Sequence, residues 1–521
     1  MGQWVLSLDV GTSSVRCAAY DVRGRQLPFG VTSRSQTPKS GVGGEVTYGA
    51  DELVERVAEV LDEGLSRVPA EALRSGPVGV AVTTFWHSLV GVDVAGRAVT
   101  DVWLWRDGRS HAQAAALRER LDEREVHART GCVLHATYAP ARLRWFAQER
   151  PEVCARVWRW MTFAEYLCGR LFGFESARMS VSMASGTGLF DQHRCDWDDE
   201  VLAASGIDRG LLPPIAEDGF AARGLLAPWR TRWPALAEVP WLPAVGDGAA
   251  SSVGAGCTTR ERAALMVGTS VALRVLFRDD HDTAAGAERL QIPWGVWGYR
   301  LDRRRVLLGG ALNDGGGLFA WLRATLQLPD AEALERALAA APADGHGLTV
   351  LPHWGGERSP GWASDARGAI IGLGHHTTPV DLARAALEAV ALRCAEVDAR
   401  LREALPGPLQ VVATGGAFTR SKAWLQIFAD VLGTPLMTSA ETEASCRGAA
   451  LVALEQWGLL RSPDGASGAA LEDAPAREGS RFEPDPERHE RLKRAGARQR
   501  ALYAALHGDA STGPRTAPGE G

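Results

Sequence analysis

One pattern occurs twice in the 521-residue chain and restricts its folds more than any other feature. WVLSLDVGTSSVRCAAYD, residues 4–21, is an apolar run, a Gly-Thr-Ser turn and a second apolar run. ALMVGTSVALRVLF, residues 264–277, repeats this order about half-way along the chain. Each copy predicts a β-hairpin, because a short turn of small residues joins two strand-like runs. The repeat indicates two related halves, with a boundary near residues 250–258.

Apolar runs alternate with helix-period segments along the rest of the chain, which is typical of an α/β fold. We expect strands over 5–8, 15–20 and 78–85, and helices over 51–63, 378–401 and 486–506. The chain is rich in Pro, Gly and Asp over residues 462–481, and the last stretch has few apolar residues. We therefore expect an N-terminal domain (1–253), a C-terminal domain (254–461) and a final segment (462–521) that holds a linker, a closing helix and a disordered tail.

The charge balance is mildly acidic, with 57 basic and 63 acidic residues, which gives no indication of a nucleic-acid or membrane partner. The eight cysteines form no CxxC pair, so we expect reduced core residues instead of a disulfide framework or a metal site. No signal-like segment is found, and no apolar run approaches the roughly 18 residues of a membrane span. We expect a cytoplasmic protein with small-molecule partners, for which a homodimer is allowed.

The turns of the two hairpins suit the binding of an anion. Consecutive small residues leave backbone N–H groups uncovered, and such a nest can bind phosphate oxygens. Asp9 ends the first strand just before its turn. A carboxylate there would repel phosphate directly, but it can hold Mg²⁺, usually through water, and the metal can bridge to phosphate. A plain hairpin turn without a ligand is the alternative explanation.

Five stretches together resemble the FGGY carbohydrate kinases, which belong to the actin-like ATPase superfamily. LDVGTSSVR and MVGTSVALR look like the two phosphate motifs of that family. The other three are GGAFTRSKAWLQIFADVLGTPL (415–436), GGERSPGWASDARGAIIGL (355–373) and WLWRDGR (103–109). The resemblance covers residues 4–457. It implies two ribonuclease-H-like domains that flank a deep catalytic cleft, and the transfer of phosphate from ATP, with Mg²⁺, to a sugar.

LPAVGDGAASSVGAG, residues 242–256, places Asp247 between two glycines after an apolar strand. In the family, the aspartate of this motif takes the proton from the attacking sugar hydroxyl. The chemistry asks for such a base within hydrogen-bond reach of a hydroxyl that is in line with the γ-phosphorus. An aspartate that only stabilises a turn is the alternative.

The resemblance also implies the nucleotide-binding residues. The phosphates are expected to contact Gly11, Thr12, Ser13, Gly268 and Thr269. Arg16 is expected to assist with phosphate charge, although a surface ion pair explains it nearly as well. The turn GGALNDGGGLFAWL opens a helix whose N-terminal amides suit an anion, so Asn313 and Gly316 are expected in the nucleotide cleft. The adenine is expected between Gly415, Gly416 and Ala417.

On the acceptor side we expect His87, Trp105, Asp107 and Arg109 to bind the sugar together with Asp247. Trp105 can stack on the C–H face of a sugar while the charged pair takes hydroxyl groups. For His87, a structural histidine is an equal alternative. The bulky Phe85-Trp86 pair departs from the family pattern and puts the identity of the acceptor in doubt.

Three further stretches look like the gluconokinase branch: TTFWHSLVGVD, GCVLHATYAPARLRW and SVSMASGTGLFDQHRCDWD. The resemblance implies phosphorylation of D-gluconate at its terminal hydroxyl to 6-phosphogluconate. The carboxylate of gluconate needs a cation or amides, for which Arg109, Arg142 and His135 are candidates. Arg142 and Arg144 are better explained as solvated helix positions. A kinase for a ketopentose such as D-xylulose, and a non-catalytic sensor of sugar or nucleotide, remain alternatives.

Overall fold

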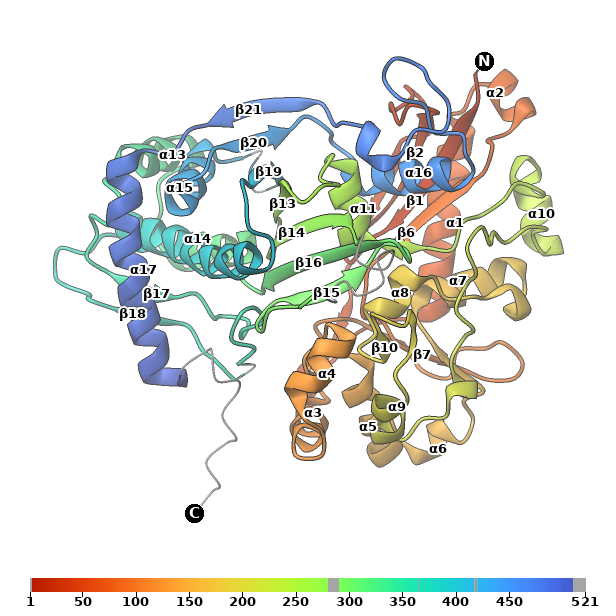
Figure 1. Cartoon of the computed structure of the whole chain (residues 1–521), viewed down its shortest axis with the longest axis horizontal. Coiled ribbons are helices and arrows are strands. Elements are labelled where there is room, and N and C mark those ends of the chain that lie inside the picture. Colours follow the sequence, from red (N-terminus) through yellow and green to blue (C-terminus); the bar gives the residue numbers. More distant parts are fainter. Residues whose placement is uncertain (1, 280–289, 364, 417, 419, 509–521) are drawn as a thin grey trace.

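Two mixed β-sheets form the centres of the two halves of the molecule (Figure 1). The structure is a computed structural model and describes residues 2–279, 290–363, 365–416, 418 and 420–508. The strands of the N-terminal sheet are β12 (Val245–Gly246), β6 (Val80–Thr84), β1 (Trp4–Val10), β2 (Ser14–Asp21) and β3 (Thr32–Ser35), in that order. The strands of the C-terminal sheet are β15 (Trp297–Arg300), β16 (Arg305–Leu312), β14 (Val271–Arg278), β13 (Arg262–Val267), β19 (Gln410–Thr414), β20 (Leu436–Ser439) and β21 (Glu478–Phe482).

The two sheets share a five-strand arrangement. In the N-terminal half β1 is antiparallel to β2, β2 is antiparallel to β3, and β1, β6 and β12 are parallel. In the C-terminal half β13, β14, β16, β19 and β20 repeat these relations in the same chain order. The expected fold class, two ribonuclease-H-like α/β domains, is therefore confirmed. The repeated sequence pattern is the first hairpin of each domain.

Short helices and small sheets cover the N-terminal half. The helices are α1 (Ala50–Ser66), α2 (Ala70–Ser75), α3 (His111–Arg118), α4 (Glu123–Thr130), α5 (Ala139–Glu149), α6 (Pro151–Cys154), α7 (Phe163–Phe172), α8 (Val181–Ser185), α9 (Asp199–Ser205), α10 (Ala227–Arg232) and α11 (Asp247–Gly254). The small sheets are β4 (Lys39–Ser40) with β5 (Val46–Tyr48) and β8 (Val102–Trp103), β7 (Val90–Val92) with β9 (Arg159–Met161), and β10 (Phe190–Asp191) with β11 (Asp196–Trp197).

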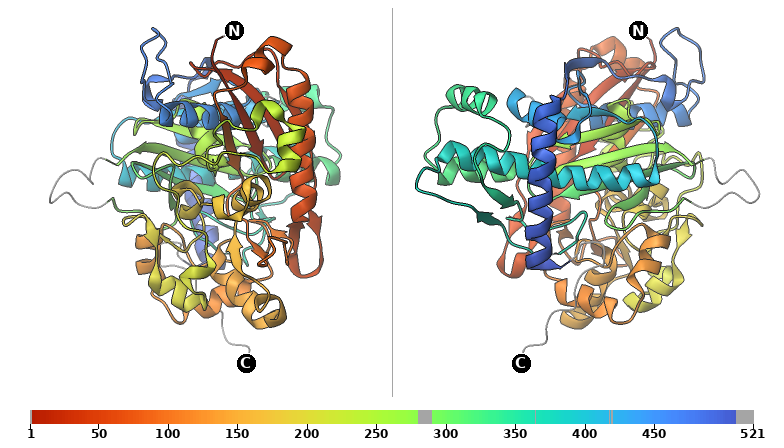
Figure 2. Two further views of the ribbon diagram at one scale, coloured as in Figure 1. Left: turned by 90° about the vertical axis from the view of Figure 1, so that its right-hand side faces the viewer. Right: turned by 60° about the vertical axis from the view of Figure 1, so that its left-hand side comes forward.

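Longer helices cover the C-terminal half, and Figure 2 shows the last of them running past the long helix α14. The helices of this part of the chain are α12 (Gly316–Thr325), α13 (Ala331–Ala340), α14 (Pro379–Ala404), α15 (Lys422–Leu432), α16 (Ala444–Gln456) and α17 (Pro486–His507), of which α16 packs on the N-terminal sheet instead. A separate hairpin is formed by β17 (Thr349–Leu351) and β18 (Ala369–Ile371).

Helices α11 and α16 connect the two halves through their backbones. A Cβ atom at Gly254 would lie 1.8 Å from the carbonyl oxygen of Ala444, and one at Gly448 would lie 1.7 Å from that of Ala250. Only glycine permits this approach at either position. Because α16 also packs on β1 and β6, a C-terminal helix completes the core of the N-terminal half.

The three expected helices are confirmed as α1, α14 and α17. Helix α14 begins as its sequence predicts, because Thr378 and Asp381 form a capping box around a proline at the first turn. The sequence analysis missed β21, which lies inside the segment expected to be a linker and closing helix and pairs with β20. The tail over 509–521 lies outside the described residues.

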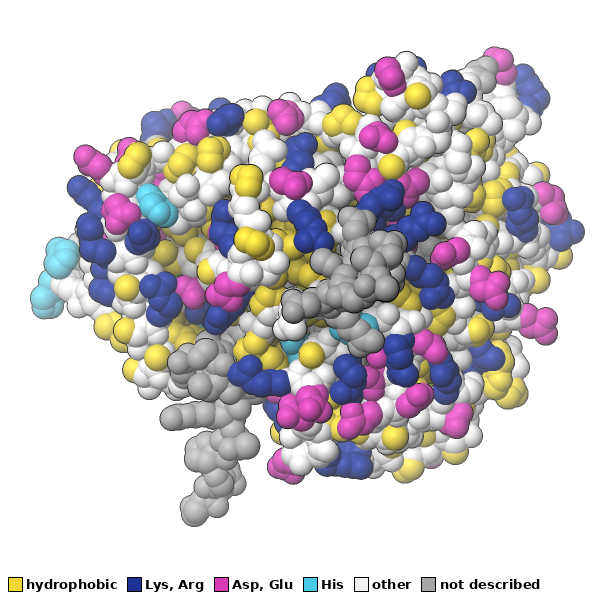
Figure 3. Space-filling view, in the orientation of Figure 1, with side chains coloured by type: hydrophobic (Ala, Val, Ile, Leu, Met, Phe, Trp, Pro, Cys, Tyr) yellow, Lys and Arg dark blue, Asp and Glu magenta, His cyan; other side chains and the backbone are white. Residues whose placement is uncertain are grey.

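The surface and the cysteines have few special features. Acidic and basic side chains are interspersed over most of the face drawn in Figure 3. All eight cysteines are free thiols, and several lie in the core. Among the helices that the structure describes, none is long and apolar enough to cross a membrane.

Candidate active site

A cavity of about 1180 Å³ lies between the two halves, and both hairpin turns line it. The N–H of Gly11 donates to the carbonyl of Ser14 at 2.9 Å, and the N–H of Gly268 donates to that of Ser270 at 2.9 Å. The next two N–H groups of each turn have no acceptor among the described residues. These turns therefore present uncovered amides to the cavity, as a phosphate nest requires. The predicted residues lining it here are Gly11, Thr12, Ser13, Gly268 and Thr269.

Asp9 lies at the bottom of the first hairpin and is 4 % exposed. Its Oδ1 is buried without a hydrogen-bond partner among the described atoms, and its Oδ2 lies 3.6 Å from Nη1 of Arg16. Burial, together with the nearby Asp247 and Glu443, raises the pKa of Asp9 to about 7, although Arg16 opposes the shift. A buried carboxylate with an unused oxygen and acidic neighbours suits a divalent cation.

Asp9 can supply one ligand to Mg²⁺, but the described part of the chain does not supply a complete set of ligands. Among the described residues, no group of three or more His, Cys, Asp or Glu side chains could hold a metal ion. Phosphate oxygens and water would supply the remaining ligands, which is the usual way proteins bind Mg²⁺ beside a nucleotide. Arg16 pairs with both Asp9 and Glu443, at 3.6 and 3.7 Å, so the ion-pair explanation of this residue also has direct support.

Asp247 is the first residue of α11 and also lines the cavity. The indole of Trp86 covers the two neighbouring glycines, since a Cβ at Gly246 would lie 1.9 Å from its ring. Burial raises the pKa of Asp247, and Arg274 acts in the opposite direction. Nη1 of Arg274 donates to the carbonyl of Gly248 at 2.7 Å, which holds this cation beside the carboxylate.

His87 lines the same cavity in a left-handed backbone conformation, with φ of 62°. Burial, with Arg142 and Arg358 nearby, lowers the pKa of His87 to about 3, so the ring is neutral. Nδ1 lies 2.6 Å from the carbonyl of Gly186, which can only accept, so this nitrogen carries the proton. Nε2 is then left as an acceptor for a hydroxyl group.

Several aromatic rings line the cavity around His87. Trp105 donates from Nε1 to Thr12 Oγ1 at 3.3 Å, which ties it to the first turn. The hydroxyls of Tyr138 and Tyr299 lie 2.7 Å apart, and both rings contact His87. Trp362 packs against Tyr138, with the ring centres 6.2 Å apart. The sequence analysis assigned no role to these two tyrosines or to Trp362, since only the fold brings the two halves together here.

Asp107 and Arg109 were expected to bind the sugar, but neither lines the cavity. The side chain of Asp107 is fully buried and accepts from the N–H of Val46 at 3.0 Å and from Nη2 of Arg109 at 2.7 Å. The guanidinium of Arg109 lies 3.7 Å from the centre of the Trp103 ring and also pairs with Glu45. Their contacts support the segment that carries Trp105, which corrects the expectation of direct contact.

Arg142 is neither a solvated helix position nor free to bind a substrate carboxylate. It is 1 % exposed and donates to the backbone carbonyls of His87, Leu104 and Ala136. Arg144 donates to the carbonyl of Ala204. His135 is buried beside Thr137 and is not among the residues that line the cavity. The three cations expected from sequence to bind a substrate carboxylate, Arg109, Arg142 and His135, therefore do not line the cavity.

Of the residues expected beside the adenine, Gly415 and Gly416 line the cavity, while Ala417 lies outside the described residues. Gly415 has φ of 102°, and a Cβ there would lie 2.4 Å from the carbonyl of Val267. Asn313 and Gly316 do not line the cavity. The side-chain amide of Asn313 donates to the carbonyl of Gly355 at 2.8 Å and so holds the loop before Arg358. The N–H of Gly316 donates to the carbonyl of Gly268 at 2.8 Å and so supports the second hairpin.

Comparison with known proteins agrees with this geometry. Residues 4–254 match the N-terminal domain, and residues 263–457 the C-terminal domain, of the FGGY family of carbohydrate kinases. The chain is 25 % identical to a gluconokinase of Bacillus subtilis (strain 168) over 483 residues, 90 % of each chain. It is 30 % identical to a glycerol kinase of Dechloromonas aromatica (strain RCB) over 513 residues, 97 % of this chain and 98 % of the relative.

Solved structures share the fold over almost the whole chain. A gluconate kinase from Lactobacillus acidophilus superposes with a TM-score of 0.85 at 23 % identity, covering 97 % of this chain and 98 % of the other. A ligand-bound xylulose kinase from Lactobacillus acidophilus gives the same TM-score of 0.85, identity of 23 % and coverage of 97 % and 98 %. With both family domains matched in order across this chain, it belongs to the FGGY family of carbohydrate kinases.

Proposed function

We propose that this carbohydrate kinase transfers the γ-phosphoryl group of ATP to the terminal hydroxyl of a sugar acid, D-gluconate being the first candidate. The observation that carries the proposal is the position of Asp247, which lines one cavity together with Asp9 and both hairpin turns. A base, a metal anchor and two sets of uncovered amides in one cavity are the parts that phosphoryl transfer requires.

In the proposed mechanism the acceptor hydroxyl donates a hydrogen bond to Asp247. The carboxylate takes the proton as the new O–P bond forms, and the bond between the γ-phosphorus and ADP breaks. The amides of Thr12 and Thr269 bind phosphate oxygens, and Asp9 orients the metal site. When bound there, Mg²⁺ neutralises part of the charge on the β- and γ-phosphates. Most of the rate enhancement comes from this alignment and charge neutralisation.

In the proposed enzyme, water is kept from the reaction by the walls of the acceptor end, which is the part of the cavity around His87 and Trp105. Trp86 and His87 come from the N-terminal half, whereas Tyr299 and Trp362 come from the C-terminal half. A filled acceptor site between these rings leaves little space for a competing water at the phosphorus. The proposed enzyme therefore favours transfer to sugar over hydrolysis of ATP.

A sugar acid is favoured over a neutral sugar by the charge of the acceptor end. Arg274 and Arg358 both line the cavity, and Arg274 lies beside Asp247. The likeness to a gluconokinase in sequence agrees with this choice. A ketopentose kinase is the second candidate, supported by the shared fold with a xylulose kinase and by the polar groups of His87, Tyr138 and Tyr299.

The test is an ADP-release assay with Mg-ATP and a panel of D-gluconate, D-xylulose, L-ribulose, glycerol or no acceptor. We expect the largest kcat/KM with D-gluconate and a small rate without acceptor. Preference for a ketose or for glycerol would replace the proposed acceptor while keeping the kinase. Tight nucleotide binding with no turnover for any acceptor would favour a sensor.

A further inference from the structure

Arg358 is a cation of the acceptor end whose guanidinium has no carboxylate partner. It follows β17 in the chain, in the segment GGERSPGW, and lines the cavity. Among the residues that the structure describes, no Asp or Glu oxygen lies within 4 Å of it. Its Nε is buried without an acceptor, and the one hydrogen bond that its guanidinium makes within the described part of the chain, from Nη2 to the carbonyl of Leu312, is 3.5 Å long. A buried donor without an acceptor is costly, which indicates that a ligand completes the site.

The position of this guanidinium is fixed by its surroundings. Its Cζ lies 4.6 Å from the centre of the ring of Trp105, a residue of the N-terminal half. Burial lowers the pKa of Arg358 to about 10, and Arg274 and Arg106 contribute to the shift. The group is therefore still charged near neutral pH, and its nearest charged neighbours repel it.

A buried cluster holds the loop that carries Arg358. The preceding residue, Glu357, forms an ion pair with Arg393 on α14 and accepts from the hydroxyl of Tyr503 on α17 at 2.6 Å. A Cβ at Gly361 would lie 2.0 Å from that same hydroxyl. Both arms of the loop are thus packed against the C-terminal helices, so the cation is preorganised and loses little entropy when a ligand binds.

The other two cations nearby are differently occupied. Arg274 donates to Gly248 and Ser251 and lies beside Asp247, so its charge is partly compensated. Arg106 is exposed and lies 5.7 Å from the Trp105 ring centre. Of these three, only the half-buried Arg358 has a buried guanidinium nitrogen, Nε, without an acceptor among the described residues.

We propose that Arg358, a residue of the C-terminal half, binds the carboxylate of the acceptor and so sets the preference for sugar acids. The inference rests on the proposed function, since it needs an acid as the acceptor. A planar guanidinium can donate two parallel bonds to a carboxylate, and the ring of Trp105 holds its plane. The far end of the acceptor then extends toward Asp247, between His87 and the two tyrosines.

The test compares Arg358→Gln with Arg106→Gln, which removes the same charge from the mouth of the cavity. For Arg358→Gln we expect KM for D-gluconate to rise ~100-fold, because a charge-assisted hydrogen-bonded pair is lost. We expect kcat to fall much less. For Arg106→Gln we expect a rise of about 3-fold or less, as for an exposed charge. Arg358→Lys should recover part of the loss, and thermal melting of each variant checks that it is folded.

D-Glucitol, the neutral polyol of the same chain length, provides the second arm. The ratio of kcat/KM for D-gluconate over D-glucitol should fall toward 1 in Arg358→Gln. A fall in kcat with unchanged KM for both acceptors would overturn the inference and assign Arg358 to the transferred phosphoryl group. An unchanged KM for D-gluconate in a folded variant would overturn it as well. If the unaltered enzyme phosphorylates no sugar acid, the proposed function fails first, and the inference fails with it.

Discussion

The two hairpins have the same fold but carry different side chains. In the first, Asp9 pairs with Arg16 across the strands, and residues 11–13 form the turn. In the second, Met266 occupies the place of Asp9 and pairs with Ala272, and residues 268–270 form the turn. Both turns present uncovered amides to the cavity, but only the first has a carboxylate beneath them.

The difference shows that the backbone conformation of a duplicated fold is kept in both copies, whereas the carboxylate beneath the turn is found in one copy. The backbone nests recur because the strand arrangement recurs. The carboxylates Asp9 and Asp247 both belong to the N-terminal half, whereas the second hairpin offers a neutral thioether. A polyphosphate held between two acidic hairpins would be repelled from both sides, so one metal-anchoring half and one neutral half suit an anionic ligand better.

The largest effect is expected for Asp247→Asn, which leaves the shape of the acidic half and removes its base. We expect turnover to fall by about 10³-fold or more, within the range for general bases, while nucleotide and sugar still bind. Steady-state kinetics and calorimetric titration together measure both quantities. A variant with a near-normal rate would rule out the base assignment.

Asp9→Ala makes the first hairpin as neutral as the second. We expect the Mg²⁺ concentration for half-maximal activity to rise roughly 10–100-fold, as for loss of a residue that orients a metal through water. Nucleotide binding without metal should be less affected. Metal titrations of activity test this, and an unchanged Mg²⁺ dependence would argue against the anchor.

Met266→Asp is the reverse change and makes the second hairpin acidic. The new carboxylate would lie close to Arg274, whose Nη2 is 3.8 Å from Sδ of Met266, and would face the phosphates. We expect Mg-ATP to bind about 10-fold more weakly, since a like charge now faces the ligand. Met266→Leu keeps the volume and is the control. Equal affinities of the two variants would show that the asymmetry has no electrostatic meaning.

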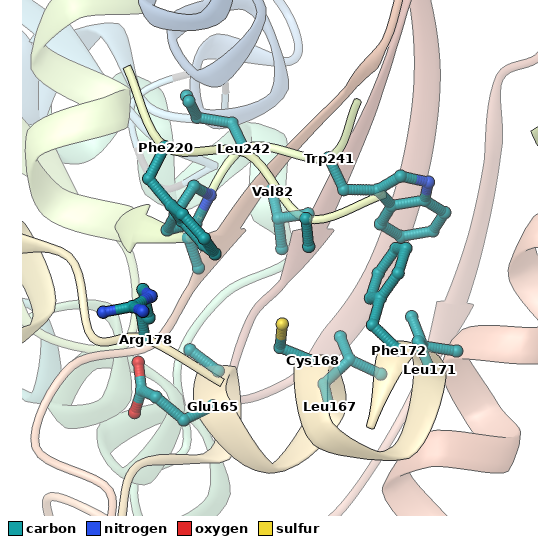
Figure 4. A pocket seen from close by; sticks show the side chains of 14 residues that line it. Val82, Glu165, Leu167, Cys168, Leu171, Phe172, Arg178, Phe220, Trp241 and Leu242 are labelled. Atoms are coloured by element: carbon teal, nitrogen blue, oxygen red, sulfur yellow. The ribbon is translucent and has the colours of Figure 1, made fainter. Parts of the chain in front are cut away.

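The smallest effect concerns a buried carboxylate of the N-terminal half that lies away from the hairpins. Glu165 caps α7 and lines a small internal cavity of about 30 Å³ (Figure 4). Burial raises the pKa of Glu165 to about 7, above its ordinary 4.5. The folded state thus binds the proton more tightly, so this group's contribution to stability is greatest below pH 4.5 and is lost as the pH rises to about 7.

Glu165→Gln keeps the shape of the cap and removes the charge. We expect its melting temperature to exceed that of the unaltered protein by roughly 1–3 °C at pH 8, and the difference to vanish near pH 5. Thermal unfolding at both pH values, with activity as a control, measures this. A constant difference between the two pH values would contradict the assigned pKa.

Local sequence patterns predicted the parts of the site that depend on neighbouring residues. Apolar runs on either side of a short turn of small residues predicted both hairpins. The position of Asp247 was predicted because it follows an apolar strand that ends in glycine. Helix α14 could be predicted because its cap and apolar stripe are contiguous in sequence.

The errors concern side chains whose partners lie far away in the chain. The carboxylate of Asp107 is bonded to Val46 and Arg109, and the guanidinium of Arg142 donates to three carbonyls from separate segments. Arg358 and Trp362 reach the acceptor end only because the C-terminal half packs against the N-terminal one. A motif shows that such residues matter, but only the tertiary contacts show whether each faces a ligand or supports a neighbour.

The shared acceptor end has a consequence for engineering. Because His87 and Trp105 come from one half and Tyr299, Arg358 and Trp362 from the other, we expect that exchanging a single domain would not transfer the substrate preference of the proposed acceptor site. A chimera that joins one half of this chain to the other half of a relative would inherit half a binding site. Retargeting the enzyme therefore calls for paired substitutions on both sides of the interface, and natural changes of substrate in such a scaffold have to be correlated across it.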